Sequence, residues 1–111
     1  LSKRPNILVI GVGSIGERHL RCFKSTDRCD MALCETLLDR RDGVAMEYGV
    51  AGYASIEEAL DAQSFDAAII AVPAPFHVPL ATQLTGHGLH LLIEKPLATT
   101  LEGVTELLQL I

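Results

Sequence analysis

The sequence is poor in the features that mark metal-binding and disulfide-bonded proteins. Its 111 residues include three cysteines, an odd number without the spacing of a metal site or of a disulfide framework. The four histidines also lack metal-ligand spacing. We therefore expect no metal site, and we expect reduced thiols in a cytoplasmic protein.

Long apolar runs and basic stripes are missing as well. No run approaches the ~20 apolar residues that a membrane helix needs, and no signal peptide follows the basic residues near the start. The net charge of −5 and the lack of a basic stripe argue against a nucleic-acid partner. Apolar residues make up 49% of the chain, which is enough for one globular domain over residues 1–111.

The main positive signal is a glycine-rich loop at 11–16, with the sequence Gly-Val-Gly-Ser-Ile-Gly. It follows an apolar run at 7–10 and precedes a segment with helical spacing, which is the setting of a dinucleotide-binding loop. The first glycine permits a sharp turn, the second lets a pyrophosphate approach the backbone, and the third lets the helix lie close to the strand. The expected cofactor contacts in this loop are Gly11, Gly13, Ser14, Ile15 and Gly16.

Strands and helices are predicted to alternate five times along the chain. Apolar runs predict strands over residues 6–10, 30–35, 50–53, 66–72 and 89–93. Helical spacing and capping residues predict helices over 14–25, 38–48, 55–62 and 76–85, and a last helix after 99. This alternation predicts an α/β fold: a doubly wound parallel sheet between two helical layers, with strand order 3-2-1-4-5.

The last helix is predicted to begin with a capping box of Thr99 and Glu102. Its apolar stripe runs to the final residue without a stop signal and consists of Leu101, Val104, Leu108 and Ile111. We therefore expect that the chain is truncated and that a further domain follows it.

Glu35 ends the second predicted strand and is the candidate for binding a ribose. A carboxylate there accepts hydrogen bonds from the 2′- and 3′-hydroxyls and repels a 2′-phosphate. The simpler alternative is a solvated acid at a strand end. Arg40 and Arg41 could instead serve a 2′-phosphate, although solvated helix residues are the simpler interpretation for them. This pattern favours NAD over NADP as the cofactor, with NADP possible.

Two further segments end at the same edge of the predicted sheet. Val72 and Pro73 leave the fourth strand and His77 begins the next helix, so this backbone should pass near the cofactor; a structural histidine is an equally good interpretation of His77. The Glu-Lys-Pro sequence at 94–96 ends the fifth strand. Lys95 should point toward the crevice and could exchange a proton there, although position alone favours a surface lysine.

Together, the glycine loop, Glu35, Val72-Pro73 with His77, and Glu94-Lys95-Pro96-Leu97 resemble the N-terminal domain of the Gfo/Idh/MocA family. The resemblance covers essentially the whole chain and implies a Rossmann fold in an NAD(P)-dependent oxidoreductase. It implies that Lys95 serves substrate and proton transfer and that Glu94 lines the nicotinamide site. It further implies a second domain with most substrate contacts and a homo-oligomer interface, and a small-molecule substrate with a sugar, inositol or related hydroxyl. The chain alone would be catalytically incomplete.

Two functions from other classes remain open at this point. A regulatory module that senses NAD(H) would share the glycine loop and Glu35 but would have no need for Lys95. A methyltransferase that depends on S-adenosylmethionine also uses a glycine-rich loop and an acid after the second strand. The complete glycine loop and the Glu-Lys-Pro segment disfavour the methyltransferase.

Overall fold

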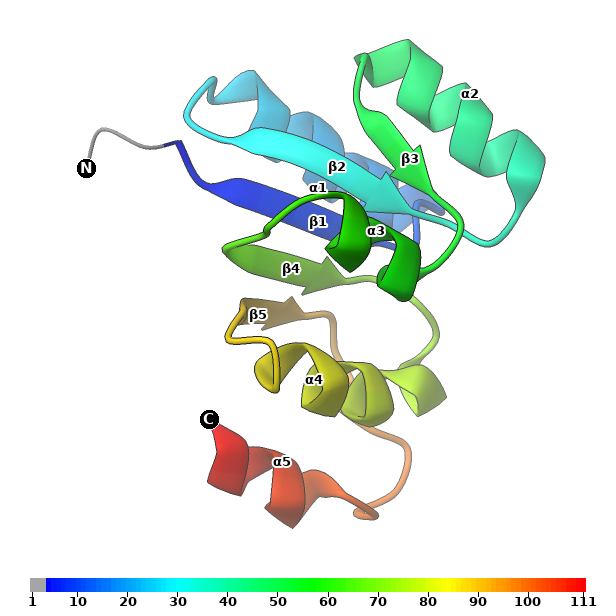
Figure 1. The fold of residues 1–111 in the computed structure, drawn as a ribbon. Helices are drawn as coiled ribbons and strands as arrows, with labels where there is room; N and C mark the ends of the chain where they lie inside the picture. Colours follow the sequence, from blue (N-terminus) through cyan, green and yellow to red (C-terminus); the bar gives the residue numbers. More distant parts are fainter. Residues whose placement is uncertain (1–3) are drawn as a thin grey trace.

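The computed structural model describes residues 4–111, which form a five-stranded parallel sheet with helices on both faces (Figure 1). The strand order β3-β2-β1-β4-β5 confirms the topology predicted from the sequence. The strands are β1 (Asn6–Ile10), β2 (Asp30–Cys34), β3 (Ala51–Tyr53), β4 (Ala67–Ile70) and β5 (His90–Ile93). All but β1 are slightly shorter than predicted.

The helices are α1 (Ser14–Ser25), α2 (Leu38–Tyr48), α3 (Ile56–Ala62), α4 (His77–Thr85) and α5 (Val104–Leu110), with a short 3₁₀ helix, η1 (Ala74–Phe76), before α4. The first two have the predicted bounds. Ser55 caps α3 as predicted, since its hydroxyl accepts the N–H of Glu58 at 3.1 Å. Within residues 4–111, none of these helices is both long and apolar enough to cross a membrane.

Each face of the sheet buries its own apolar cluster. Along β1, Leu8 and Ile10 pack toward α3 and α4, whereas Ile7 and Val9 pack toward α1 and α2. Leu20 of α1 is fully buried in the second cluster. Because both sets of alternating residues are apolar, the strand is covered on both sides, as expected of a central parallel strand.

The predicted start of the last helix is wrong. The Thr99–Glu102 capping box does not form; instead the Thr100 hydroxyl accepts the N–H of Glu102 at 3.3 Å. The helix begins only after Gly103, whose φ of 78° lies in the left-handed region that favours glycine. This turn separates α5 from the residues before it and changes which side chains face the core.

The apolar stripe predicted for this helix is wrong for three of its four members, whereas Val104 packs against the core as predicted. Leu107 is the buried side chain of α5 and packs with α4, whereas Leu101 and Leu108 are exposed. Ile111 follows the helix and is exposed as well. Three leucines or isoleucines of the predicted stripe therefore lie on the protein surface.

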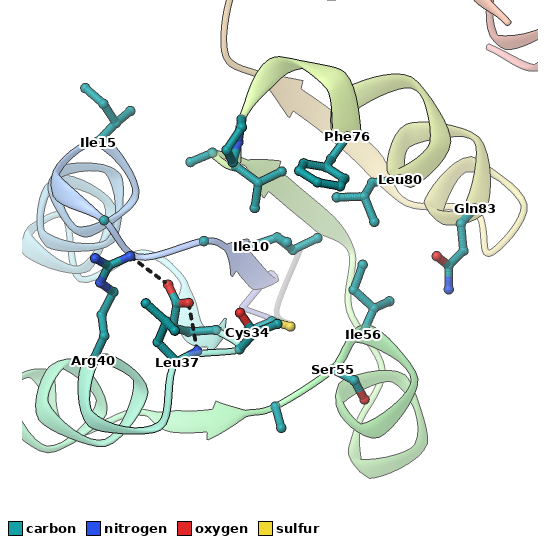
Figure 2. Close-up of a pocket in the computed structure, with 18 of the residues that line it drawn as sticks. Ile10, Ile15, Cys34, Leu37, Arg40, Ser55, Ile56, Phe76, Leu80 and Gln83 are labelled. Carbon is teal, nitrogen blue, oxygen red and sulfur yellow. Dashed lines mark hydrogen bonds and ion pairs between the residues drawn. The ribbon is translucent and has the colours of Figure 1, made fainter.

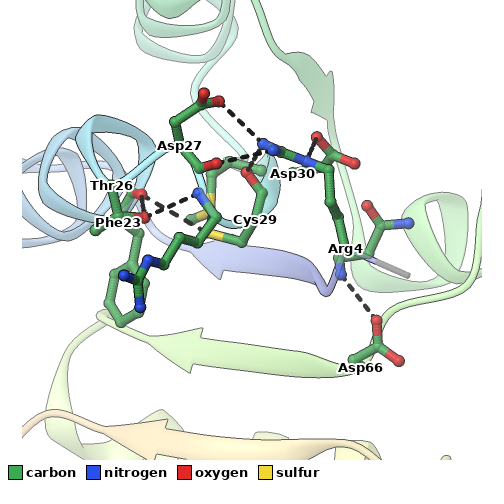
Figure 3. Close-up of polar contacts among 10 residues, drawn as sticks. Arg4, Phe23, Thr26, Asp27, Cys29, Asp30 and Asp66 are labelled. Carbon is green, nitrogen blue, oxygen red and sulfur yellow. Dashed lines mark hydrogen bonds and ion pairs between the residues drawn. The ribbon is translucent and has the colours of Figure 1, made fainter. Parts of the chain in front are cut away.

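At the amino ends of the strands, Arg4 joins the start of the chain to the α1–β2 connection (Figure 3). Its guanidinium donates to the Cys29 carbonyl oxygen at 3.1 Å and to the Asp30 carboxylate at 3.2 Å. Nearby, the N–H of Asn6 donates to the Asp66 carboxylate at 2.8 Å. These bonds connect the starts of β1, β2 and β4, at the edge of the sheet opposite the glycine loop.

Candidate functional site

A cavity of about 920 Å³ opens at the carboxyl ends of β1, β2 and β4 (Figure 2). Pockets for small molecules and cofactors typically measure ~300–1,000 Å³. Figure 2 shows Arg40 and Leu37 on one side of the cavity and Phe76 and Leu80 on the other. Most of the cofactor contacts expected from the sequence line it: Gly11, Gly13, Ser14, Ile15, Glu35, Val72 and Pro73.

Two glycines of the loop are required by the packing around them. Gly11 has a φ of +86°, and a Cβ there would lie 2.8 Å from the Val72 side chain. A Cβ on Gly16 would lie 1.7 Å from the carbonyl oxygen of Gly11, so any side chain would push α1 away from β1. Gly13 differs, because its nearest neighbour, an Arg40 nitrogen, is 3.8 Å from the Cβ position. The Gly13 backbone is therefore open to a ligand.

The first turn of α1 has free hydrogen-bond donors that face the cavity. The helix begins after Gly13, and no side chain there caps its N-terminus. The first N–H groups of a helix have no partner within the helix, and the helix dipole makes this end positive. With Ser14 and Ile15 on the cavity wall, the loop suits the pyrophosphate of a dinucleotide.

Glu35 lies on the cavity wall beside this loop and is 7% exposed. Its Oε1 accepts the N–H of Val12 and its Oε2 accepts the N–H of Leu37, each at 3.1 Å. The Arg40 guanidinium is 3.7 Å from Oε1. A carboxylate has about four lone-pair positions, so each oxygen can still accept a hydroxyl. The geometry therefore fits the diol of a ribose.

The pKa of Glu35 is lowered from its ordinary value. Burial alone would raise this pKa, but the N–H groups of Leu37 and Val12 and the charge of Arg40 more than offset the burial. The carboxylate is therefore ionised at neutral pH. An ionised acid at this position favours hydroxyl donors and repels a phosphate.

The far side of the cavity carries an apolar patch that the sequence did not indicate. Ile56 of α3, Phe76 of η1 and Leu80 of α4 line it. The Cys34 thiol also lines the cavity. Burial, and after it the charge of Glu35, raises the pKa of this thiol to about 11, so it is uncharged at neutral pH and adds to the apolar lining. Such a wall suits a flat aromatic base. No sequence pattern marks these residues, because they come from different elements.

Three of the expected site residues lie outside the cavity lining, as does Gly16. His77 is 1% exposed, and its ring nitrogens contact the carbonyl oxygens of Val72 and Pro96. Lys95 is exposed just beyond the end of β5. Direct contact of His77, Glu94 and Lys95 with a cofactor therefore stays a prediction.

Glu94 has a partner that the sequence did not indicate. Its carboxylate lies 2.5 Å from Nε2 of His19, a residue of α1. This hydrogen bond lowers the pKa of Glu94. The two residues are far apart in the sequence, and the packing of α1 against the sheet brings them together.

The chain matches, over residues 5–111, the Gfo/Idh/MocA family model, described as an oxidoreductase family with an NAD-binding Rossmann fold. The chain belongs to the Gfo/Idh/MocA family. It is the NAD-binding Rossmann domain of that oxidoreductase family, in agreement with the cavity and the resemblance read from the sequence. The methyltransferase alternative is thereby excluded.

Named relatives and solved structures match nearly the whole chain. Inositol 2-dehydrogenase of Corynebacterium glutamicum (strain ATCC 13032) is 32% identical over 113 residues, which are 99% of this chain and 34% of the relative. The crystal structure of myo-inositol 2-dehydrogenase from Lactobacillus plantarum matches with a TM-score of 0.89 at 28% identity, over 97% of this chain and 33% of that one. GenD2 from gentamicin A biosynthesis, in complex with NAD, matches with a TM-score of 0.90 at 25% identity, over 97% and 31%. This Gfo/Idh/MocA chain spans about a third of the length of the relatives.

Gly16→Ala should destabilise the domain and weaken NAD binding, whereas Gly43→Ala should do neither. The added methyl group at 16 would collide with the Gly11 carbonyl and displace the first turn of α1. Gly43 lies inside α2 with open space around it, so alanine should raise the free energy of unfolding by ~0.5–1 kcal/mol. Urea denaturation and calorimetry with NAD measure both effects. Normal stability and affinity in Gly16→Ala would contradict the contact.

Glu35→Gln should remove a contribution to stability that depends on pH. Because the pKa of Glu35 is lowered by folding, its contribution is full above the unfolded-state value of about 4.5 and is lost as the pH falls through the folded-state value. The difference in urea midpoint between wild type and variant should be constant from pH ~7 to ~5.5 and should shrink below ~4.5. An equal difference at neutral and acid pH would contradict this origin.

Proposed function

We propose that this domain binds NAD through Glu35 and the glycine loop, and that it serves an enzyme that transfers hydride between nicotinamide and a hydroxyl of a polyol or sugar. The observation that carries the proposal is the Glu35 carboxylate, fixed by two backbone N–H groups beside the free first turn of α1. Relatives named inositol 2-dehydrogenase support a cyclic polyol as the substrate.

The arrangement around Glu35 supports NAD over NADP. A 2′-phosphate would lie against an ionised carboxylate, which repels it. The two neighbouring arginines already have partners and so do little to attract a 2′-phosphate. The Arg40 guanidinium lies 3.7 Å from the Glu35 carboxylate, and Arg41 donates to the Glu35 carbonyl oxygen at 3.0 Å. Arg41 therefore stabilises the turn after β2 and does not face a ligand.

Glu35→Ala should weaken NAD binding by ~10-fold or more, since hydrogen bonds to a charged group contribute ~1.5–3 kcal/mol. The same variant should narrow the gap between NAD and NADP, because the repulsion of a 2′-phosphate is removed. Glu58→Ala is the control, an exposed acid of α3 outside the cavity lining. Isothermal titration calorimetry with both cofactors measures the affinities. A wild-type preference for NADP would refute the role of Glu35.

For the chemical step, we propose Lys95 as the residue that exchanges the proton of the substrate hydroxyl. Bound NAD supplies the hydride acceptor, so a group of the protein must lie within ~3 Å of the hydroxyl to take its proton. Lys95 is exposed, and its ammonium has no hydrogen-bond or ion-pair partner within residues 4–111. Glu94 suits the task less well, because His19 already binds its carboxylate and lowers its pKa.

In the complete gene product, Lys95→Ala should lower kcat by ~10²-fold or more, as expected for loss of a general acid–base group. Lys95→Arg should be similarly impaired, because arginine keeps the charge but does not release its proton. The KM for NAD should change little, since Lys95 does not line the cavity. Near-normal kcat in either variant, measured with myo-inositol and other polyols, would refute the proton-transfer role of Lys95. A wild-type protein that binds NAD(H) but oxidises none of these polyols would favour an NAD(H)-sensing module.

The complete gene product is further proposed to be a cytoplasmic homo-oligomer. Within the described residues all three cysteines are free, which suits a reducing compartment. The exposed side chains of Leu108, Leu110 and Ile111 support a contact with further protein surface at this end of the chain.

A further inference from the structure

The segment that holds Lys95 has few backbone hydrogen bonds of its own. The N–H of Glu94 donates to the Ile70 carbonyl oxygen at 3.1 Å, which extends the pairing of β5 with β4 by one residue. Pro96 has no N–H to donate. Beyond the end of β5, side chains from elsewhere must therefore hold the backbone on which Lys95 is carried.

Two histidines supply these contacts, one from each helical layer. His19 of α1 binds the Glu94 carboxylate from one face of the sheet. His77 of α4 contacts the Pro96 carbonyl oxygen from the other face, with its Nδ1 at 2.9 Å. Glu94 and Pro96 are thus held on either side of Lys95.

His77 also connects this segment to the cavity. Its Nε2 lies 2.6 Å from the carbonyl oxygen of Val72, which lines the cavity. A carbonyl oxygen only accepts, so a neutral ring donates to one of the two carbonyls and a doubly protonated ring donates to both. At 1% exposure the ring is shielded from water, which would otherwise compete for these bonds.

We propose that His77 is a positioning residue for Lys95: the contact of its Nδ1 with the Pro96 carbonyl oxygen holds the Lys95–Pro96 backbone, while His19 holds Glu94 from the opposite layer. Lys95 then has a fixed backbone and a free side chain. This inference rests on the proposed catalytic role of Lys95. It predicts that His77 affects the chemical step through Lys95, with little effect on cofactor affinity.

The two ring contacts can be separated with a pair of conservative variants. The side-chain amide nitrogen of asparagine takes the place of Nδ1, and that of glutamine the place of Nε2. His77→Asn should therefore keep the bond to Pro96 and retain kcat within ~3-fold, whereas His77→Gln should lose that bond and fall by ~10-fold, about the effect of one hydrogen bond. The KM for NAD should stay within ~2-fold in both variants.

The decisive measurement is a double-mutant cycle in the complete gene product, with kcat for polyol oxidation as the readout. If His77 acts through Lys95, His77→Gln should have no further effect on the residual kcat of Lys95→Ala. Amide hydrogen exchange without cofactor should show faster exchange at Lys95 and Leu97 in His77→Gln than in His77→Asn. His87→Ala, an exposed histidine in the turn after α4, is the control for general effects.

Distinct outcomes separate this proposal from the proposed function. Equal kcat in His77→Asn and His77→Gln, or an undiminished effect of His77→Gln in the Lys95→Ala background, would overturn the positioning role. Normal kcat in Lys95→Ala would instead refute the catalytic role of Lys95. If the variants are too unstable for kinetics, equal hydrogen exchange at Lys95 in the two folded His77 proteins at low temperature also overturns the proposal.

Discussion

The rest of the structure depends on the close contact between Gly16 and Gly11. No side chain fits between them, because a Cβ on Gly16 would lie 1.7 Å from the Gly11 carbonyl oxygen. Because Gly16 has no side chain, α1 lies directly on the sheet, so that Leu20 reaches the core while the first turn faces the cavity. The same loop supplies the Val12 N–H that binds Glu35. Packing and cofactor recognition therefore share one short stretch of backbone.

The strand order could be predicted because the central strands are apolar on both faces, as in Asn6–Ile10 and Ala67–Ile70, and because the glycine loop defines the first crossover. The start of α5 could not be predicted, because Thr99 and Glu102 have the residue types and the spacing of a capping box but do not form its hydrogen bonds. Gly103 carried the contrary signal, since its left-handed backbone conformation interrupts the helix. A local capping pattern predicts the start of a helix only where the residues that follow it can be helical.

The candidate site was predicted in part. Spacing alone placed Glu35 beside the loop, since the position after the second strand is set by the fold. The contacts of His19 with Glu94 and of His77 with Pro96 had no sequence signal, because they join residues on different elements. The apolar wall that includes Phe76 was also missed. A single sequence does not distinguish an apolar side chain that lines a cavity from one that fills the core.

Replacing Glu35, the residue proposed to favour NAD over NADP, also changes the partner of a buried backbone group. Val12 is 2% exposed, and the Glu35 carboxylate accepts its N–H. A buried donor left without an acceptor costs ~1–3 kcal/mol, a large part of the stability of a small domain. Replacements that still accept a hydrogen bond, such as serine or asparagine, avoid much of this cost. Selection for stability thus favours, as the first step of a change in cofactor preference, a residue at position 35 that is uncharged but still accepts the Val12 N–H.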